Sequence, residues 1–449
     1  MPGIESRQRK LRPLLWPLGR LYAGAMWFRE RLYRVGLLTS WLPGVPVVAV
    51  GNIGWGGSGK TPLAGWLLRW AANRGLSPVL LTRGYRSLAT RFPLLVTADS
   101  LPEESGDEPL LLARHCPEAQ IVVDPERRRG GAWAMERGRP DLFVLDDGFQ
   151  HLGVGRDLDI VLLKRDDLDL DWNQAIPAGP WREGAGALSR AGCFAIKLDP
   201  ADYSGLRPLL EERLERFRRP VFTFSLRPSG VRHLRSGQNS PDLGGRRYLL
   251  VSGVGDHDQV ARTAERLLGR PALHRRFPDH HFFTGRDAAE IADQARIHDC
   301  DYVVCTGKDA VKLLNLADDL YWELRVEVEF GPALFCEASF PAWWAARWET
   351  LVRAAADRAR DNAADPGGKG RDVRGNGPGG SSDRAAAANL DDDMSGDALT
   401  DGDTGDDETG VPDEISPAAS AERAADAGTP GNSGSPGKPT ASRLRGTGD

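Results

Sequence analysis

Eight consecutive residues of this 449-residue chain have the types and spacing of a loop that binds phosphate groups. They fit the pattern G-x4-G-K-[ST] and are Gly54, Trp55, Gly56, Gly57, Ser58, Gly59, Lys60 and Thr61. Glycines let the backbone turn tightly enough for successive N–H groups to converge on a polyphosphate at the start of a helix. The lysine then reaches the β and γ phosphates, and the threonine hydroxyl can bind Mg²⁺. This segment predicts a binding site for a nucleoside triphosphate.

Three of the same glycines also fit the fingerprint of dinucleotide-binding proteins. They are Gly54, Gly56 and Gly59, which spell G-x-G-x-x-G. A site for NAD requires an acidic residue about 20 residues later, at the end of the second strand. Here the strand expected at 79–82 runs into Arg83, which suits the 2′-phosphate of NADP. An NADP-dependent dehydrogenase is therefore an alternative, although it leaves the lysine and the threonine unexplained.

Two carboxylates follow an apolar run further along the chain. Residues 142–145 read Leu-Phe-Val-Leu and lead into Asp146 and Asp147. Beside a phosphate loop, such a strand places a carboxylate next to the metal ion. We expect the pair to join Thr61 in a Mg²⁺ site, one carboxylate directly and the other through water, and the sequence does not tell which is which. The alternative is a buried strand that ends in an ordinary Asp-rich turn.

The first 36 residues are basic and rich in large apolar side chains. They carry eight Arg or Lys and two Glu, a net charge of +6. Apolar residues recur at helical spacing, and Trp and Tyr flanked by Arg suit the level of lipid headgroups; the recurring positions are Leu14, Leu18, Leu21, Ala25, Phe28 and Leu32. This pattern predicts a helix in the membrane surface, the alternative being a helix packed on the protein's own core. No apolar run reaches the roughly 18 residues of a spanning helix, and no signal-peptide cleavage site follows.

The carboxyl-terminal segment has a different composition. From Asp361 onward it has no Phe, Trp or Tyr, and it holds 18 Asp or Glu against 8 Lys or Arg. Such a segment buries too little apolar surface to offset its ordering entropy, so we predict a disordered acidic tail. The chain's five cysteines lack C-x-x-C spacing, which favours a reducing cytoplasm over a disulfide framework or a zinc site.

Strand-like runs alternate with helical segments between these ends. Six runs predict a P-loop NTPase-type, mainly parallel sheet flanked by helices, with ligands at the carboxyl ends of the strands: 45–50, 79–82, 121–123, 143–145, 160–163 and 194–198. A second set predicts a smaller α/β domain, with strands at 221–224, 248–252, 302–305 and 324–330 and helices near 257–269 and 287–298. The cleft between the two domains would be the natural reaction site.

This α/β interpretation divides the chain into four parts. Residues 1–42 form the basic, aromatic membrane-surface region, and 43–215 form the P-loop domain. Residues 216–350 form the second, substrate or lid domain, and 361–449 form the acidic tail.

Six further segments follow the phosphate loop in an order that resembles a known family. They are 106–109 (GDEP), 146–151 (DDGFQH), 156–160 (RDLDI), 177–183 (PAGPWRE), 277–281 (FPDHH) and 308–312 (KDAVK). Over residues 12–348 the chain resembles the tetraacyldisaccharide 4′-kinases, the lipid A kinases of Gram-negative bacteria. The resemblance implies transfer of the γ-phosphate of ATP to the 4′-hydroxyl of a tetraacyldisaccharide 1-phosphate, giving lipid IVA, on the cytoplasmic face of the inner membrane. It implies a lipid substrate and a membrane surface as partners, and no nucleic acid.

The resemblance also implies roles for individual residues. Asp107 would accept the proton of the sugar hydroxyl, with His280 as its partner across the cleft and His281 as the alternative partner, while Lys60 neutralises phosphate charge. Without the resemblance, the sequence favours Asp107 as the N-cap of a helix over a catalytic role.

Four more residues receive roles in the same way. Glu183 would be a third carboxylate near the metal, and Arg182 could pair with a phosphate or remain an exposed loop residue. Gln150 and His151 would orient phosphate or substrate, or pack beneath the Asp pair. Two other functions remain alternatives: a P-loop kinase of a soluble metabolite and a non-catalytic nucleotide switch at the membrane.

Overall fold

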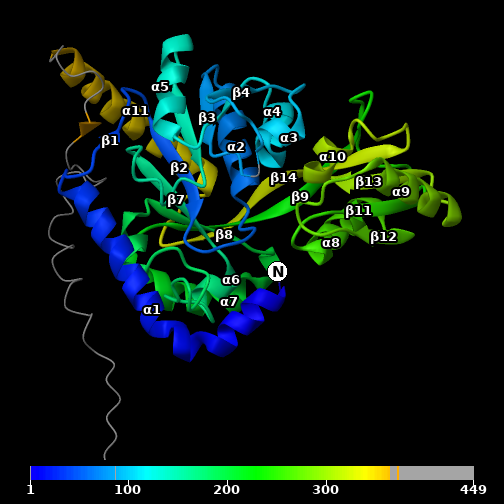
Figure 1. Cartoon of the computed structure of the whole chain (residues 1–449), viewed down its shortest axis with the longest axis horizontal. Helices are drawn as coiled ribbons and strands as arrows, with labels where there is room; N and C mark the ends of the chain where they lie inside the picture. Colours follow the sequence, from blue (N-terminus) through cyan, green and yellow to red (C-terminus); the bar gives the residue numbers. More distant parts are fainter. Residues whose placement is uncertain (1, 86, 365–371, 374–449) are drawn as a thin grey trace, which may run out of the picture. The chain divides into compact units, whose positions relative to one another are not determined.

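The computed structural model describes residues 2–85, 87–364 and 372–373. Within them, one sheet of 13 strands has the order β12-β11-β13-β14-β9-β8-β7-β2-β6-β3-β5-β4, with β10 paired to β9 (Figure 1). A separate two-stranded sheet joins β1 (Ser40–Trp41) to β15 (Asp372–Val373). The mainly parallel large sheet, flanked by helices, confirms the predicted fold class.

The first part of the large sheet carries the phosphate loop. Its parallel strands lie at the six predicted runs and are β2 (Val47–Asn52), β3 (Pro78–Thr82), β5 (Gln120–Val123), β6 (Leu142–Asp146), β7 (Leu158–Leu163) and β8 (Cys193–Lys197); the edge strand β4 (Leu94–Val96) is antiparallel and was not predicted. β2 lies between β6 and β7. The carboxyl ends of these three strands therefore meet at one edge, where the phosphate loop and the Asp pair begin.

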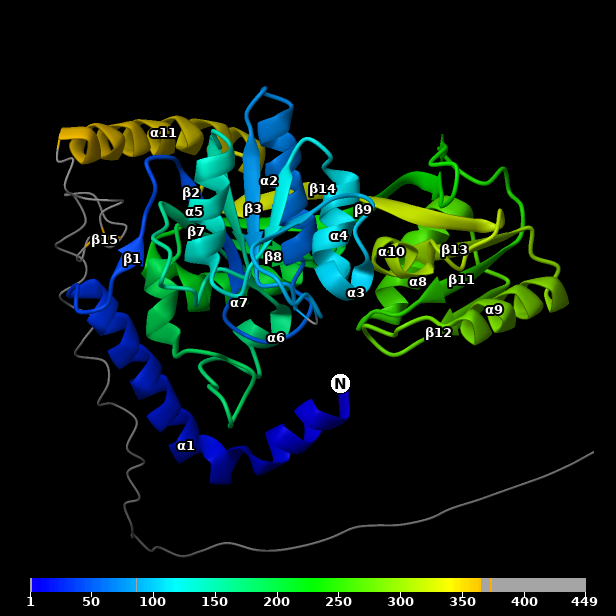
Figure 2. The same cartoon turned by 45° about the horizontal axis from the view of Figure 1, so that its top comes forward.

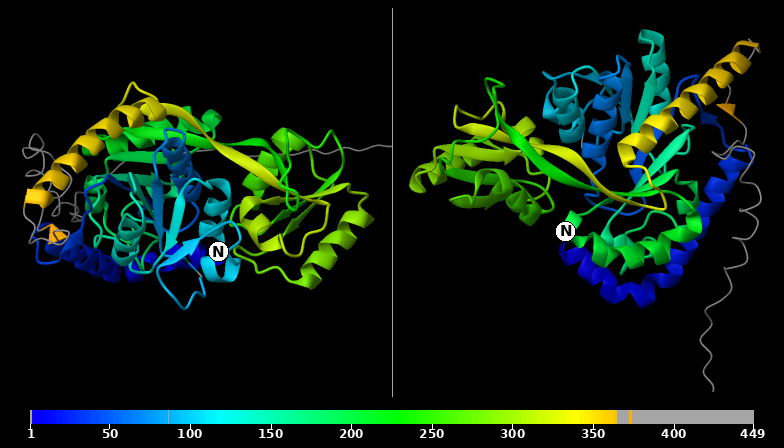
Figure 3. Two further views of the ribbon diagram at one scale, coloured as in Figure 1. Left: turned by 90° about the horizontal axis from the view of Figure 1, so that it is seen from above. Right: turned by 180° about the vertical axis from the view of Figure 1, so that it is seen from behind.

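Helices cover both faces of this part. One face carries α2 (Lys60–Ala72), α4 (Asp107–His115) and α11 (Phe340–Ala364). The other carries α5 (Arg127–Arg137), α6 (Arg165–Leu168), α7 (Tyr203–Leu214) and the 3₁₀ segment η1 (Ala185–Arg190). Short segments complete the connections: α3 (Pro102–Ser105), η2 (Pro200–Asp202) and η3 (Glu215–Phe217). Trp344 of α11 is fully buried and meets Trp70 of α2 edge to face, with ring centroids 5.4 Å apart, so α11 is anchored beside α2 (Figure 3).

Two long strands connect the first part of the sheet to the second. β9 (Val221–His233) and β14 (Tyr321–Leu334) pair antiparallel along their length (Figure 2). The second part adds the parallel strands β11 (Tyr248–Ser252), β12 (Leu273–Arg276) and β13 (Tyr302–Thr306), and the short β10 (Asn239–Ser240). α9 (Gly285–Ile297) and α10 (Gly307–Leu313) pack on one face and α8 (His257–Leu268) on the other. The predicted domain boundaries stay a prediction, since one sheet runs through both parts.

The amino-terminal region forms one long helix, α1 (Pro2–Arg34). It runs along the outside of the first part, past α6 and α7, and bends in a region that contains Pro13 and Pro17 (Figures 1 and 2). Between residues 8 and 34, Gly19 and Glu30 are the buried positions. Most of the apolar stripe predicted from the sequence faces outward, with Leu14 76% and Leu21 72% exposed. The helix therefore does pack on the protein, as the alternative predicts, but through a narrow inner face; the predicted apolar stripe is not part of the core.

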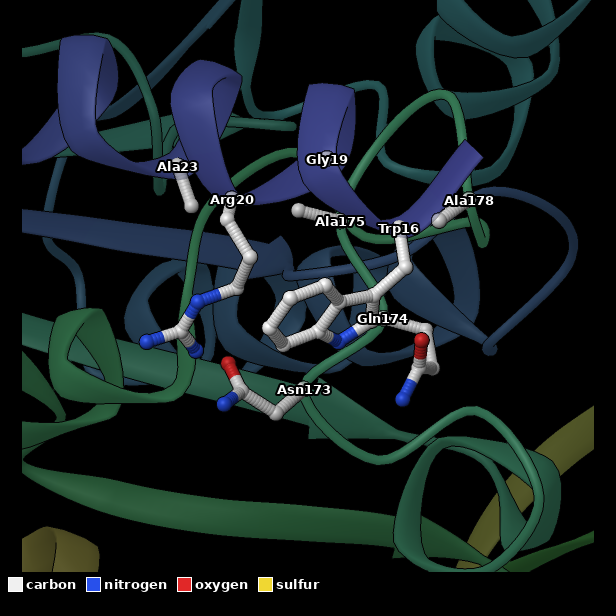
Figure 4. Close-up of a pocket in the computed structure, with 8 residues that line it drawn as sticks. All are labelled: Trp16, Gly19, Arg20, Ala23, Asn173, Gln174, Ala175 and Ala178. Atoms are coloured by element: carbon white, nitrogen blue, oxygen red, sulfur yellow. The ribbon is translucent and has the colours of Figure 1, made fainter. Parts of the chain in front are cut away.

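A close contact holds the inner face of α1 against the loop that follows α6. A cavity of about 10 Å³ remains at this contact, enough for about one water molecule (Figure 4). Its lining residues are Trp16, Gly19, Arg20, Ala23, Asn173, Gln174, Ala175 and Ala178. A side chain on Gly19 would lie 2.8 Å from the carbonyl oxygen of Ala175, so the helix can approach this loop because residue 19 is glycine. We interpret the cavity as a small packing defect between α1 and this loop and not as a ligand site.

The predicted tail falls mostly outside the described residues. Of 361–449, residues 361–364 form the end of α11, and Asp372–Val373 pair with β1. The other residues of the tail lie outside the described part of the chain.

Candidate active site

The phosphate loop lies between β2 and α2, as its pattern predicts. Gly56 and Gly59 both have φ of +92°, a backbone conformation that favours glycine. A Cβ on Gly59 would lie 2.8 Å from the ring of Phe224, and one on Gly54 would lie 2.7 Å from a carboxylate oxygen of Asp167. α2 begins at Lys60 without a side-chain cap, so the amides of its first turn are left for a ligand. The residues present therefore fit a polyphosphate.

The polar side chains of the loop already have partners from other segments. Lys60 Nζ donates to Asn52 Oδ1 at 3.0 Å and lies 3.5 Å from Asp147 Oδ1. Thr61 Oγ1 donates to Glu108 Oε2 at 2.6 Å. The hydroxyl of Ser58 is buried and has no hydrogen-bond partner among the described residues, while Trp55 is partly exposed.

Asp146 and Asp147 lie at the end of β6 in different environments. Asp147, at φ of 49°, is held by Arg182 through two hydrogen bonds of 2.9 Å. Burial raises its pKa, but this hydrogen bonding and the charge of Lys60 outweigh burial and lower the pKa to about 2. Asp147 is therefore an ionised carboxylate whose charge is already neutralised by a guanidinium.

Asp146 has no such neutralisation. Its Oδ2 accepts a hydrogen bond from Thr82 Oγ1 at 3.1 Å, whereas its Oδ1 is buried without a partner among the described residues. Burial and the negative charges of Glu108 and Asp147 raise its pKa. A buried carboxylate oxygen without a partner is the kind of ligand that a hard divalent cation prefers, so the hydrogen bonding favours Asp146 over Asp147 as a direct ligand of the predicted Mg²⁺.

Glu183, the third carboxylate of the predicted metal site, is bound elsewhere. Its Oε1 accepts a hydrogen bond from Arg190 Nη2 at 2.8 Å, and both side chains are buried. Within the described residues, no three Asp, Glu, His or Cys side chains gather where they could hold a cation together. Arg182 next to it reaches the site, since it binds Asp147 and donates to Asn52 Oδ1 at 2.5 Å.

Gln150 and His151 follow the Asp pair along the chain. Gln150 Nε2 donates to the carbonyl oxygen of Asn52 at 3.1 Å, so it holds the end of β2. His151 lies beside Arg127, and burial together with that positive charge lowers its pKa to about 3. A histidine that stays neutral at physiological pH is suited to packing beneath the Asp pair.

Asp107 and His280 come together from distant parts of the sequence. Asp107 is the first residue of α4, and His280 lies in the loop after β12. His280 Nδ1 lies 3.2 Å from Asp107 Oδ2. The N-cap position of α4 is Gly106, and no side chain caps the helix, so the N-cap reading of Asp107 is wrong. The alternative partner, His281, pairs with Asp287 at 3.3 Å instead.

Lysines from α10 surround the carboxylates at the start of α4. Lys312 Nζ is buried, 3.6 Å from Asp107 Oδ2 and 3.2 Å from Asp309 Oδ1. Burial raises the pKa of Asp107, but the hydrogen bond with His280 and the charges of Lys312 and Lys308 outweigh burial and lower it. Lys308 pairs with Glu108, the same carboxylate that binds Thr61. Asp107 is therefore an ionised carboxylate one residue away from a contact with the phosphate loop.

Several of these residues received no role from the sequence. Glu108, Lys308 and Lys312 fall inside the motifs of the family resemblance, and the i, i+4 spacing of the two lysines places them on one helix face. Asn52 carried a weaker signal, as a polar residue that ends an apolar strand. Arg127 carried none, because it stands in a run of three arginines of which it alone is buried.

Comparisons with known proteins agree on one family. A family model described as tetraacyldisaccharide-1-P 4′-kinase matches residues 11–339. The tetraacyldisaccharide 4′-kinase of Nitratidesulfovibrio vulgaris is 47% identical over 351 residues, which cover 78% of this chain and 98% of that protein. The one from Oleidesulfovibrio alaskensis is 48% identical over 354 residues, covering 77% and 98%.

A solved structure is also similar. It is a crystal structure of the "apo" form of LpxK from Aquifex aeolicus in complex with ATP. It aligns with a TM-score of 0.58 and 29% sequence identity, and the alignment covers 72% of this chain and 95% of that one.

Proposed function

Because this chain belongs to the tetraacyldisaccharide-1-P 4′-kinase family, we propose that it transfers the γ-phosphate of ATP to the 4′-hydroxyl of tetraacyldisaccharide 1-phosphate and so forms lipid IVA. One observation supports this most directly. Adjacent residues of α4 contact both halves of the required chemistry: Glu108 binds Thr61 of the phosphate loop, and Asp107 pairs with His280. A base for the acceptor hydroxyl thus lies beside the site for the donor phosphates.

The phosphate loop and its surroundings bind and neutralise the donor. The amides at the start of α2 and the ammonium of Lys60 contact the phosphates. The hydrogen bond to Asn52 holds Lys60 near the loop. When phosphate binds, Lys60 either gives up this bond or divides its N–H donors between Asn52 and the phosphate. Mg²⁺, when bound, neutralises charge on the phosphate oxygens; Thr61 and Asp146 would hold it, with Asp147 fixed beside them by Arg182.

Asp107 and His280 act on the acceptor. Asp107 is kept ionised first by the hydrogen bond from His280 and then by the charges of Lys312 and Lys308, and it accepts the proton of the attacking hydroxyl at a carboxylate oxygen. His280 orients that carboxylate through Nδ1. Such a positioned base typically contributes about 10²- to 10⁴-fold in rate, and the remainder of catalysis comes from holding the two substrates in line.

The outward face of α1 supports contact with a membrane surface; we take this surface to be the cytoplasmic face of the inner membrane, as the family resemblance implies. No helix within the described residues is long and apolar enough to cross a bilayer. α1 instead exposes large apolar side chains among basic ones, including Leu14, Leu21 and Trp27. Basic residues attract anionic phospholipid headgroups, and the apolar side chains enter the region beneath them. The proposed occupant of this face is therefore the lipid bilayer that also holds the acceptor.

The test of the reaction is transfer of labelled γ-phosphate to purified tetraacyldisaccharide 1-phosphate in mixed micelles. We expect transfer by the full chain and its loss in Lys60→Ala and Asp107→Asn. Asp202→Asn is the control for the second variant, because it replaces an exposed aspartate by asparagine away from the site. ATP hydrolysis without lipid phosphorylation would favour a kinase of a soluble metabolite. Unchanged activity of Asp107→Asn would contradict the proposed base.

The test of the membrane contact is sedimentation with phospholipid vesicles. Leu21→Glu should weaken binding about tenfold or more, because burying a leucine is worth about 1.5–3 kcal/mol and about 1.4 kcal/mol is a factor of ten. Ile297→Glu is the matched control, since Ile297 of α9 is 65% exposed and lies far along the chain from α1. Equal binding by the two variants would remove α1 from the membrane contact.

A further inference from the structure

The inner face of α1 carries a buried carboxylate. Glu30 is 9% exposed, whereas its neighbours on the helix are exposed or half-buried. A buried carboxylate is costly unless it is paired. It has two partners: Arg34 of the same helix, whose Nη2 donates to Glu30 Oε1 at 2.7 Å, and Arg190, whose Nη1 donates to Glu30 Oε2 at 2.5 Å. The guanidinium of Arg190 also donates to Glu183 Oε1 at 2.8 Å, so a single buried arginine joins two carboxylates.

This buried triad reaches the candidate active site. Glu183 follows Arg182, the residue that holds Asp147 through two hydrogen bonds. Phe149 lies in the loop that begins at the Asp pair. The guanidinium of Arg190 lies over its ring, 4.4 Å from the ring centroid. One guanidinium therefore contacts both loops that fix the metal-side carboxylates, and α1 contacts that guanidinium.

A second contact runs from α1 to the same place. Arg29 Nη1 donates to the carbonyl oxygen of Gln150 at 3.2 Å, and Gln150 Nε2 donates to the carbonyl oxygen of Asn52. The side chain of Asn52 accepts hydrogen bonds from Lys60 and Arg182. Two neighbouring residues of α1 are thus connected by short chains of hydrogen bonds to the phosphate loop.

The opposite face of the same helix is the apolar face described above. Leu21, Trp27 and Phe28 are all more than half exposed. These residues lie within about three helical turns of Glu30, so a bilayer that binds this face acts on the segment of α1 that carries the contact with Arg190. The other anchor of α1 pairs Arg9 and Arg12 with Asp171. Arg12 also donates to the carbonyl oxygen of Ala178, but the ion pairs with Asp171 include no residue of the triad and neither Arg182 nor Asp147.

We propose that contact of α1 with an anionic bilayer positions Arg182 and the Asp147 loop through the Glu30–Arg190–Glu183 triad and thereby strengthens nucleotide binding at the phosphate loop. This inference rests on the proposed function for the nucleotide and for the membrane contact of α1. Glu30, Arg190 and Glu183 are positioning residues, since they act through Arg182 and Phe149. Coupling is reciprocal, so bound nucleotide strengthens membrane binding by the same factor.

The experiment measures nucleotide affinity without any acceptor lipid. The full chain is titrated with a fluorescent ATP analogue and Mg²⁺, with and without vesicles of phosphatidylglycerol and phosphatidylethanolamine. We expect vesicles to lower Kd about fivefold or more, in the range usual for coupled sites. An anionic surface by itself repels the nucleotide, so surface electrostatics would change Kd in the opposite direction.

Two variants with the same chemical change locate the coupling. Glu30→Gln keeps the shape of the side chain and leaves Arg190 paired with Glu183, so the fold is retained. It should bind vesicles and nucleotide but lose the vesicle effect on Kd. Asp171→Asn breaks the other anchor of α1 and should keep the effect.

Three results would overturn the inference. Vesicles could leave the Kd of the unmodified chain unchanged, the vesicle effect on Kd could survive in Glu30→Gln, or Asp171→Asn could lose as much of that effect as Glu30→Gln does. None of these results depends on phosphate transfer. A chain that fails to phosphorylate the disaccharide but shows the Kd pattern would contradict the proposed reaction and leave the coupling in place.

Discussion

Replacing His280 with asparagine tests the pair of residues on which the proposed chemistry depends. His280 has φ of +59°, in the left-handed region, where asparagine is among the best tolerated residues. The substitution therefore adds little backbone strain, and it removes the ring nitrogen that lies 3.2 Å from Asp107 Oδ2. The neighbouring histidine offers a control, because His281→Asn makes the same change in a side chain that pairs with Asp287.

We expect His280→Asn to raise the pKa of Asp107 and to lower the rate of phosphate transfer. Burial raises the pKa of Asp107, and the hydrogen bond from His280 is the strongest of the interactions that lower it. Removing that bond raises the pKa, and a base must be ionised to accept a proton, so the acid side of the pH–rate profile moves to higher pH. A hydrogen bond to a charged group is worth about 1.5–3 kcal/mol, so on that side the ionised fraction falls about ten- to a hundredfold. On the plateau we expect a further loss of up to about 10²- to 10⁴-fold in kcat.

The assay is phosphate transfer to the disaccharide between about pH 5 and pH 9, with kcat and kcat/KM determined separately. Nucleotide Kd should stay unchanged in His280→Asn, because His280 does not contact the phosphate loop in the described structure. His281→Asn should keep the profile of the unmodified chain. If His280→Asn retains both its acid side and a plateau within about threefold, the Asp107–His280 pair is not the base of the reaction and the argument from its geometry fails.

Two further predictions concern the metal side of the site and the core. Asp146→Asn should raise the Mg²⁺ concentration for half-maximal activity more than Asp147→Asn does, because Asp146 has an unpaired buried oxygen while Asp147 is neutralised by Arg182; equal requirements would remove the distinction. Trp344→Ala should lower the free energy of unfolding by about 3–5 kcal/mol, as for other large buried aromatic side chains. Urea unfolding measures this, and KM for ATP should not change, since Trp344 packs on Trp70 and Trp348, away from the loop.

The parallel strands and the helix after the phosphate loop could be predicted because short stretches of sequence determine them. The buried parallel strands are continuous apolar runs, and α2 follows the phosphate loop directly, so both are visible in short windows. The full length of β9 was not visible. Pro228 and Gly230 lie in its middle and normally end a strand, yet both are in register with β14, where a β-bulge between Arg325 and Val326 accommodates them.

The long-range pairs of the site could not be predicted from composition or spacing. Asp107 and His280 are 173 positions apart, and only the family resemblance suggested their pairing. Glu108 and Lys308 are 200 positions apart and were not paired at all. Glu183 shows the opposite problem: the resemblance placed it near the metal, whereas its partner is Arg190, which also contacts a helix 160 positions away. A single sequence lists ionisable residues but does not say which of them meet.

In the proposed reaction, the first turn of α4 lets one short motif serve two substrates. Successive residues of a helix point about 100° apart, so Asp107 and Glu108 leave the same turn in different directions. Glu108 reaches Thr61 and Lys308, and Asp107 reaches His280 and Lys312. Both directions are available because Gly106, at φ of +85°, occupies the N-cap position and frees Asp107 from capping the helix. The carboxylate proposed for the donor side and the one proposed for the acceptor side are thereby fixed on one helix, so the distance between them is set by the geometry of a single helical turn.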